Sequence, residues 1–325
     1  MKIIKKLLLI GLVFVLCACT SPKQYVAYTI YPVGYLLNRI GGDRISPISI
    51  QDNTLVQCSQ IVQNYKEILS DSSVLFHVGD LEPYLYAYDE DVDEIGVDTQ
   101  DLSVLNALYD FKRYSLVYVD GKQNFVETDY YEGDEFASVD MYDLDLNIWL
   151  SPTGMRSMAI DVKDYLASNY VEQSSYFEDN FNVLYDELIV LDAAYNALAT
   201  KLNANNKTIK FVSMTPSFGC WQKDYGFQVY PVCLSKYGTL PTGEQLAKIK
   251  EKIVNDDVKY IAYEPNMTSE MSDLMIQLEE ELGLKRISLN NISSITDSQV
   301  QNGKDYLSLM YENLSTLESI ASVEE

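Results

Sequence analysis

Short apolar runs alternate with amphipathic stretches along most of the chain, and this alternation predicts strands followed by helices. The strands predicted in the first half are Val26–Pro32, Ile45–Ile50, Val74–Val78 and Leu116–Val119. The helices predicted between them are Gly34–Ile40 and Gln60–Leu69. The strands predicted in the second half are Ile209–Met214, Gln228–Val232, Tyr260–Tyr263 and Arg286–Leu289. Strands that alternate with helices form parallel sheets covered by helices.

One long helix is predicted between the two halves, because no proline or glycine occurs from Glu172 to Ala204. Apolar residues recur in this stretch at steps of three and four, which places them on one buried stripe. The stripe consists of Phe177, Phe181, Leu184, Leu188, Leu191, Tyr195 and Leu198. A helix of about 30 residues is roughly 45 Å long, enough to run the length of a two-lobed molecule. A later helix follows the same rule, with Thr268 or Ser269 as its N-cap.

The predicted fold class is therefore α/β, with two lobes joined by the long helix. Each lobe is expected to hold a roughly four-stranded, mostly parallel sheet flanked by helices. The predicted divisions are an N-terminal lobe over residues 25–171, a linking helix over 172–204 and a C-terminal lobe over 205–325. Bending would disrupt the packing of the helix stripe, so we expect the lobes to hinge little.

The first residues have the pattern of an export signal. Three lysines precede an apolar run from Leu7 to Ala18, which is short for a membrane-spanning helix. The run ends in the residues LCAC, which resemble a lipobox, the sequence where a bacterial signal peptidase cuts before a lipid-carrying cysteine. We expect residues 1–18 to be removed, Cys19 to carry the lipid and residues 19–24 to form a polar tether. An ordinary secretory signal with an incidental cysteine is the alternative.

The charge balance excludes nucleic acid as an expected partner. The chain has 24 basic and 48 acidic residues, and loss of residues 1–18 would leave 21 basic residues against the same 48. A net charge near −27 would repel a phosphate backbone, and it is compatible with a cationic ligand.

Three cysteines follow the expected anchor: Cys58, Cys220 and Cys233. Cys220 and Cys233 are close in sequence and could pair outside the cytoplasm. Free, buried thiols agree equally well with the spacing. Both states of these cysteines therefore remain open at this point.

The segment over residues 120–145 is strongly acidic. Its acids include Glu127, Asp129, Glu132, Asp134, Glu135, Asp140 and Asp143, against one lysine, Lys122. It lacks the alternating acids and the glycine of an EF-hand calcium loop. Such a run is typical of a solvated, partly disordered loop, which would collect ions only loosely.

Five segments stand out along the chain: YTIYPVGYLLNRIGGDRI, LFHVGDLEPYL, NIWLSPTGMRSMA, FVSMTPSFGCWQKDYGFQ and YIAYEPNMTSEM. In this order they resemble segments of the solute-binding lipoproteins of ABC importers for zinc and manganese. The resemblance covers nearly the whole mature chain. It implies two parallel-sheet lobes on a rigid linking helix, an ABC permease as the membrane partner, and one divalent metal ion, zinc or manganese, as the transported ligand.

The positions where this family has its metal ligands differ in this chain. The resemblance implies about three imidazoles and one carboxylate. The carboxylate is present as Glu264, but Asn147 replaces the imidazole expected in the third segment. Met214, or Thr215 because the loop is one residue longer, replaces the imidazole expected in the fourth. Asn147 has two open interpretations, a role in the cleft between the lobes or a cap that bonds backbone amides near Ser151.

The third imidazole of the family lies in the first lobe and falls at Gln57 or Cys58 here. The chain has one histidine, His77, at the end of a predicted strand. Ligands collect beyond the carboxyl ends of parallel strands, so His77 could face the cleft together with Met214 and Glu264. The alternative is that His77 packs against neighbouring side chains and touches no ligand.

These replacements leave several ligands open. Asparagine and glutamate oxygens favour calcium, magnesium or manganese over zinc, whereas Cys58 with Met214 would favour copper(I). A small organic solute is the third possibility, because tyrosines could form the walls of the cleft. The candidate tyrosines are Tyr28, Tyr31, Tyr35, Tyr230 and Tyr263.

Sequence motifs of enzymes are absent. The chain has no Gly-x-Ser-x-Gly elbow, no glycine-rich phosphate loop and no His-Glu-x-x-His pair. We therefore expect no catalysis, and instead a monomeric, lipid-anchored solute-binding protein on the extracytoplasmic face of the cell membrane. Its expected role is metal-ion uptake by an ABC importer with an altered ligand set. The alternatives are the same fold with a small non-metal solute, or a surface adhesin.

Overall fold

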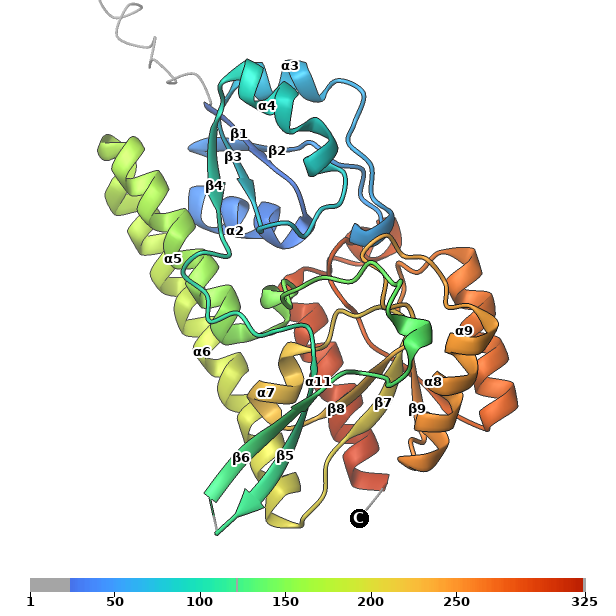
Figure 1. The fold of residues 1–325 in the computed structure, drawn as a ribbon. Coiled ribbons are helices and arrows are strands. Elements are labelled where there is room, and N and C mark those ends of the chain that lie inside the picture. The colour runs from blue at the N-terminus through green and yellow to red at the C-terminus, as the bar shows by residue number, and fades with distance from the viewer. Residues whose placement is uncertain (1–23, 121, 324–325) are drawn as a thin grey trace, which may run out of the picture.

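The computed structural model describes residues 24–120 and 122–323, which form two α/β lobes beside a pair of long helices (Figure 1). The strands of the N-terminal lobe are β1 (Gln24–Tyr28), β2 (Ile45–Ser49), β3 (Ser72–His77) and β4 (Asp98–Asp101). They run parallel in the order β2-β1-β3-β4. The helices of this lobe are α2 (Tyr31–Gly41), α3 (Tyr65–Ser70) and α4 (Asp89–Ile95).

The C-terminal lobe repeats this architecture. Its strands are β7 (Lys210–Ser213), β8 (Gln228–Pro231), β9 (Tyr260–Tyr263) and β10 (Lys285–Ser288). They run parallel in the order β10-β9-β7-β8. The helices are α7 (Cys220–Tyr225), α8 (Gly243–Asn255), α9 (Ser269–Leu282), α10 (Asp297–Gln301) and α11 (Tyr306–Val323). The predicted fold class, two parallel four-stranded sheets flanked by helices, is confirmed.

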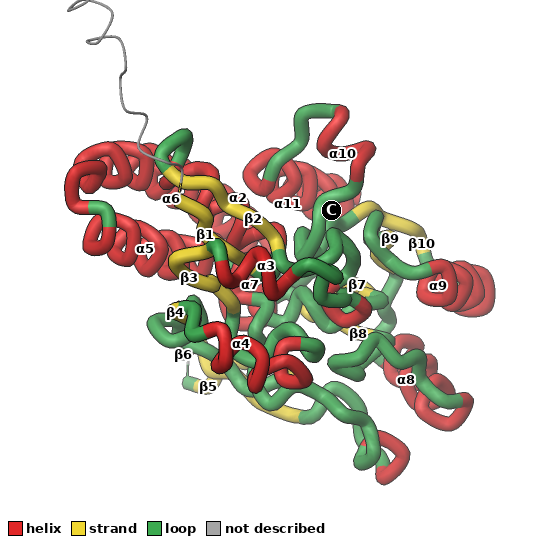
Figure 2. Tube along the Cα trace, turned by 90° about the horizontal axis from the view of Figure 1, so that it is seen from above, coloured by secondary structure: helices red, strands yellow, loops and turns green. Residues whose placement is uncertain are grey.

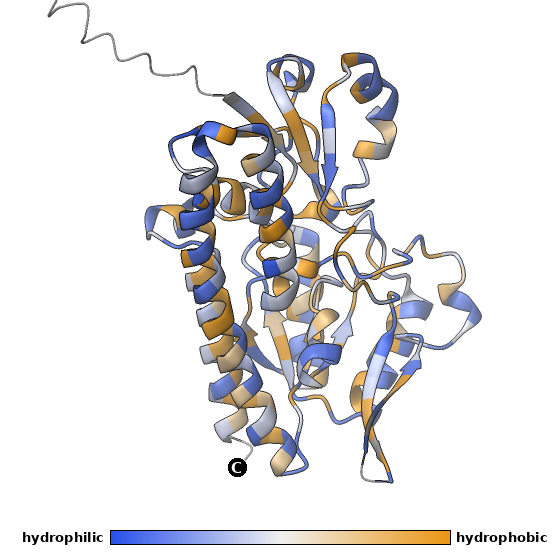
Figure 3. Ribbon diagram, turned by 90° about the vertical axis from the view of Figure 1, so that its left-hand side faces the viewer, coloured by the Kyte–Doolittle hydropathy of each residue, from blue (hydrophilic) through white to orange (hydrophobic). Residues whose placement is uncertain are grey.

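The linking helix is α6 (Ser174–Ala204), and it lies side by side with α5 (Pro152–Asn169) (Figures 1 and 2). The predicted stripe is buried, except that Phe181 is half-buried. Hydrophobic and hydrophilic residues alternate along both helices (Figure 3). Helix α6 contacts both lobes, because Asn180 donates to the carbonyl of Ile40 at 3.0 Å and Tyr195 donates to that of Met310 at 2.9 Å. Its packing on both sides agrees with a stiff connection between the lobes.

The strand predicted at Leu116–Val119 belongs to an antiparallel hairpin and not to the N-terminal sheet. Strand β5 (Arg113–Val119) pairs with β6 (Lys122–Thr128), and the hairpin lies beside the C-terminal lobe (Figure 1). The fourth strand of the N-terminal sheet is β4 instead. Its residues, DTQD, are polar and exposed or half-buried, so they carry no apolar pattern that predicts a strand.

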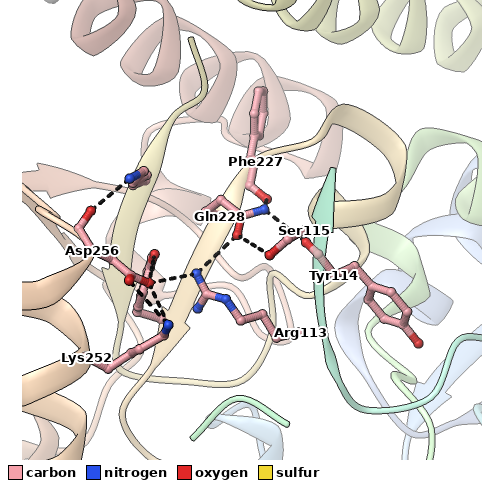
Figure 4. A network of polar contacts seen from close by, with 9 residues as sticks. Arg113, Tyr114, Ser115, Phe227, Gln228, Lys252 and Asp256 are labelled. Atoms are coloured by element: carbon pink, nitrogen blue, oxygen red, sulfur yellow. Dashed lines mark hydrogen bonds and ion pairs between the residues drawn. The ribbon is translucent and has the colours of Figure 1, made fainter. Parts of the chain in front are cut away.

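A buried arginine ties this hairpin to the C-terminal lobe (Figure 4). Arg113 is 5% exposed, and its Nη2 donates to Oε1 of Gln228 at 3.1 Å and lies 3.4 Å from Oδ2 of Asp256. Its guanidinium carbon lies 4.1 Å from the ring centroid of Tyr230. Gln228 also donates to the carbonyl of Tyr114 at 2.9 Å. The charge of Arg113 is thus compensated by a carboxylate, an amide and an aromatic face.

Residues 120–145 correct a second prediction, that of a solvated and partly disordered loop. The segment contributes strand β6 and several buried aromatic residues: Tyr130, Tyr131, Phe136 and Tyr142. Tyr131 donates to the carbonyl of Pro231 at 2.9 Å, and Tyr142 donates to that of Leu81 at 2.8 Å. The aromatic residues between the acids therefore anchor the segment to both lobes, while most of the acids face solvent.

The predicted export signal and Cys19 lie outside the described residues, as does most of the tether. Within residues 24–120 and 122–323, no helix has the length and apolar character needed to cross a membrane. The lipid anchor therefore stays a prediction from the sequence.

Candidate functional site

Glu264 directly follows β9 and is completely buried. Its Oε1 accepts hydrogen bonds from the backbone N–H groups of Met214, at 2.9 Å, and Thr215, at 3.0 Å. Its Oε2 accepts from the Thr215 hydroxyl at 2.6 Å and from Nδ2 of Asn291 at 2.7 Å. A carboxylate has about four acceptor positions. The chain itself therefore occupies all the acceptor positions of Glu264.

Burial raises the pKa of the Glu264 carboxyl, because desolvation disfavours its charged form. The hydrogen bonds from Asn291, Thr215 and Met214 act in the opposite direction, since they stabilise the carboxylate. The parallel sheet explains why these groups meet: β7, β9 and β10 are neighbours, so their carboxyl ends lie at one edge. The strand-end prediction grouped His77, Met214 and Glu264. The structure brings Met214 and Glu264 together, whereas His77 lines a pocket that does not include Glu264.

Asn291 was missed by the sequence reasoning. It follows the strand predicted at Arg286–Leu289, and a polar residue just past a strand is the signal that could have identified it. Asn291 and Asn266 exchange two side-chain hydrogen bonds of 2.8 Å. These two bonds hold the Asn291 side-chain amide in the orientation in which its Nδ2 donates to Glu264.

Asn147 is 1% exposed and bonds within its own segment. Its backbone N–H and its Nδ2 both donate to Oδ1 of Asp145, at 3.1 and 3.2 Å, and its own Oδ1 has no hydrogen-bond partner. Burial raises the pKa of Asp145 to about 6. The interpretation of Asn147 as a helix cap is wrong, because Ser151 caps α5 by accepting from the N–H of Gly154 at 3.2 Å.

Asn147 and Glu264 are both buried, and hydrogen bonds connect the segments that contain them. Trp149, two residues after Asn147, donates from its indole to the carbonyl of Asn291 at 2.8 Å. The side chain of Asn291 in turn donates to Glu264. The connection between the two positions therefore runs through Trp149 and Asn291.

The first-lobe candidates lie at the lobe junction or in a different pocket. A Cβ atom added to Gly238 of the C-terminal lobe would lie 2.8 Å from Sγ of Cys58 and 3.5 Å from Cβ of Gln57. Gln57 is 5% exposed, and neither its amide oxygen nor its amide nitrogen has a partner. His77 ends β3, and its Nδ1 lies 3.2 Å from the carbonyl of Gly79. It lines a pocket that does not include Glu264.

These residues do not fit a zinc site. Across the described ranges, no three His, Cys, Asp or Glu side chains converge to hold a metal ion. Zinc prefers nitrogen and sulfur donors in a closed tetrahedron, whereas Asn147 and Gln57 offer amide oxygens and Glu264 has no acceptor position left. Copper(I) prefers thiolate and thioether sulfur as ligands. The contact between Met214 and Glu264 is made by the Met214 backbone N–H. Burial raises the pKa of the Cys58 thiol, which disfavours the thiolate that would bind copper(I).

All three described cysteines are free thiols in this structure. The alternative of a bond between Cys220 and Cys233 is therefore not what the structure contains. Sγ of Cys220 instead lies 3.9 Å from the carbonyl of Asn147.

Two parallel-sheet lobes that meet over buried strand ends, held together by one long helix, define a two-lobed solute-binding protein. The chain belongs to the family described as ZnuA, zinc-uptake complex component A, periplasmic, whose model matches residues 26–320. This is a family of binding proteins and not of enzymes.

The chain is 26% identical over 183 residues to the zinc-binding lipoprotein AdcA of Streptococcus pneumoniae, a match that covers 56% of this chain and 35% of AdcA. It is 26% identical over 174 residues to the high-affinity zinc uptake system protein ZnuA of Bacillus subtilis, covering 54% of this chain and 52% of that protein. These matches therefore span only a third to a half of the relatives' length.

A solved structure extends the likeness to nearly the whole fold. The Zn(II)-bound ZnuA-like domain of S. pneumoniae AdcA matches with a TM-score of 0.67 at 21% identity, covering 91% of this chain and 98% of that domain. At this identity the match establishes the shared fold alone.

Proposed function

We propose that the chain is the lipid-anchored, extracytoplasmic binding component of an ABC importer, and that the position around Glu264 binds a transported metal ion only weakly. The family assignment supports the role of binding component. The names of the relatives support zinc as the cargo to be tested first. Cys19 at the end of the apolar run supports the anchor. An ABC permease in the same membrane is the expected partner of the monomer.

The observation that carries the proposal is the saturated carboxylate of Glu264. A metal ion bound there would have to displace donors such as the Thr215 hydroxyl or the Asn291 amide. A buried donor left without a partner costs about 1–3 kcal/mol. The ion would also find none of the imidazoles that zinc prefers, because Asn147 and Met214 stand at two of those positions.

Isothermal titration tests the metal part of this proposal. The mature lipoprotein, purified in detergent and stripped of metal, is titrated with zinc, manganese, calcium and copper(I). We expect each dissociation constant to be weaker than about 100 μM, which is a low affinity for a capture protein. A submicromolar zinc affinity that falls at least tenfold in Glu264→Gln, but not in the exposed control Glu270→Gln, would contradict the proposal.

The importer role requires a separate measurement. Cross-linking of the native lipoprotein in intact cells, followed by identification of the membrane partner, should recover an ABC permease. Recovery of other envelope proteins without a permease would favour the adhesin alternative.

A further inference from the structure

A pocket of about 440 Å³ lies between the N-terminal lobe and the loop that follows β8. The N-terminal lobe contributes four acids to it: Asp80, Glu82, Asp89 and Asp93. The C-terminal lobe contributes Lys236 and Tyr237. Glu264 and Asn147 are not among the lining residues, so this pocket is separate from the cluster described above.

Glu82 is the unusual member of this pocket. It is 1% exposed, and neither of its carboxyl oxygens has a hydrogen-bond partner in the described structure. A buried carboxyl group without a donor is costly and calls for a partner. Glu264 shows the contrast, because its equally buried carboxyl group is fully supplied with donors by the chain.

The surroundings of Glu82 favour a positively charged partner. Burial is the main reason that the pKa of its carboxyl is raised to about 8, and the nearby charges of Asp101 and Asp80 act in the same direction. The nearby Thr29 hydroxyl and Glu82 amide oppose the shift, but neither makes a hydrogen bond of normal geometry to the carboxyl oxygens. Asp80, Asp89 and Asp93 are exposed at the edge of the pocket. A bound cation would be attracted by these acids and would favour the ionised form of Glu82.

The lysine in the pocket does not neutralise these acids. Nζ of Lys236 lies 2.9 Å from Oδ1 of Asp140, so its charge is already paired outside the set of four acids. The same Nζ lies 5.3 Å from the ring centroid of Tyr237, so one face of this ring already carries the lysine ammonium group.

The spacing of the acids argues against a bare metal ion. No three of the His, Cys, Asp and Glu side chains in the described part of the chain converge closely enough for metal coordination. The volume of the pocket instead admits a molecule of several heavy atoms. We propose that the pocket binds a small organic cation with an ammonium or guanidinium group, with Glu82 as its main counter-ion. This inference does not depend on the importer role.

Calorimetry with defined probes tests this site. The lipoprotein is titrated with 1,4-diaminobutane and with agmatine, and with 1,4-butanediol as the uncharged analogue. We expect saturable binding of one cation per chain, no binding of the diol, and at least tenfold weaker binding in Glu82→Gln. Asp93→Asn should weaken binding about threefold, because an exposed charge contributes less. The exposed control Asp43→Asn should bind like the wild type.

Three outcomes would overturn the proposal: no saturable binding of either cation at about 1 mM, unchanged affinity in Glu82→Gln, or equally tight binding of magnesium. A thermal unfolding scan establishes that each variant is folded. If Glu82→Gln does not fold, Tyr237→Ser takes its place, and its affinity should fall several-fold. Zinc titration of the same sample reports on the Glu264 position, so failure of one proposal is distinguishable from failure of the other.

Discussion

The side-chain amide of Asn291 donates a 2.7 Å hydrogen bond to Oε2 of Glu264 and so joins the carboxyl ends of β10 and β9. The carbonyl of the same asparagine accepts from the indole of Trp149, which follows the acidic segment. Asn291 therefore connects the Glu264 carboxylate to Trp149, whose segment leads into α5 and the linking helix α6. In this chain the strand-end carboxylate has a structural role that does not require a ligand.

Removal of the Asn291 amide should destabilise the protein. Asn291→Ala leaves the buried Glu264 carboxyl with one donor fewer and removes the donor to Oδ1 of Asn266, so we expect the free energy of unfolding to fall by roughly 2–4 kcal/mol. Urea unfolding followed by tryptophan fluorescence measures the change. Asn302→Ala at the exposed end of α10 is the control and should change stability by less than about 0.5 kcal/mol. A change equally small in Asn291→Ala would show that the contact contributes little.

Glu82 should make stability depend on pH in one direction. The pKa of its carboxyl is raised to about 8 in the folded state, against an ordinary value of 4.5 in the unfolded chain. Between these values the unfolded state binds fewer protons, so stability falls as pH rises, by up to about 1.4 kcal/mol per pH unit. The total loss attributable to Glu82 is roughly 5 kcal/mol, and it is complete above the folded pKa.

The measurement compares urea unfolding of the wild type and Glu82→Gln from mildly acidic to mildly alkaline pH. The variant should lack this fall, so the difference between the two proteins should grow with pH. Glu67→Gln on the surface of α3 is the control and should follow the wild type. Parallel pH profiles of wild type and Glu82→Gln would show that Glu82 is ionised in the folded protein despite its burial.

The apolar pattern predicted the elements that are buried. Tyr260–Tyr263 has the same bounds in the structure, and the long helix begins within two residues of its predicted start, because both depend on core packing. The pattern failed for β4, a short polar strand, and for the hairpin, whose apolar strand pairs outside the main sheet. Local periodicity reports burial but does not say which sheet a strand joins.

Part of the candidate site also followed from the sequence. The strand-end rule grouped His77, Met214 and Glu264, and the structure brings Met214 and Glu264 together. The rule failed for His77, because this residue ends β3 in the sheet of the other lobe. The contribution of Asn291 and the pairing of Asn147 with Asp145 depend on side-chain orientations that no spacing specifies. The unpartnered state of Glu82 could not be predicted either, because it requires knowledge of every neighbouring donor.

The buried arginine should hold the hairpin on the C-terminal lobe (Figure 4). Arg113→Met removes the contacts with Gln228 and Asp256 but keeps a long apolar side chain, so we expect a loss of roughly 2–4 kcal/mol in the free energy of unfolding. Limited proteolysis should then cut within residues 113–128 faster than in the wild type. Arg44→Met, at an exposed ion pair with Asp43, is the matched control and should change neither quantity. Unchanged proteolysis of Arg113→Met would show that the β5–β6 hairpin is held by other contacts.

The three thiols should differ in reactivity without any disulfide. Burial raises the pKa of all three thiols, to about 12 for Cys233, and Cys58 is the one that is only half-buried. Because the thiolate is the reactive form, we expect a thiol reagent to modify Cys58 slowly in the native protein and the other two only after unfolding. In denaturant without reductant, three thiols should react in the lipidated protein, and Cys58→Ser should lose only the thiol that reacts in the native state. Recovery of a single thiol in denaturant would instead show that two of the cysteines pair in the exported protein.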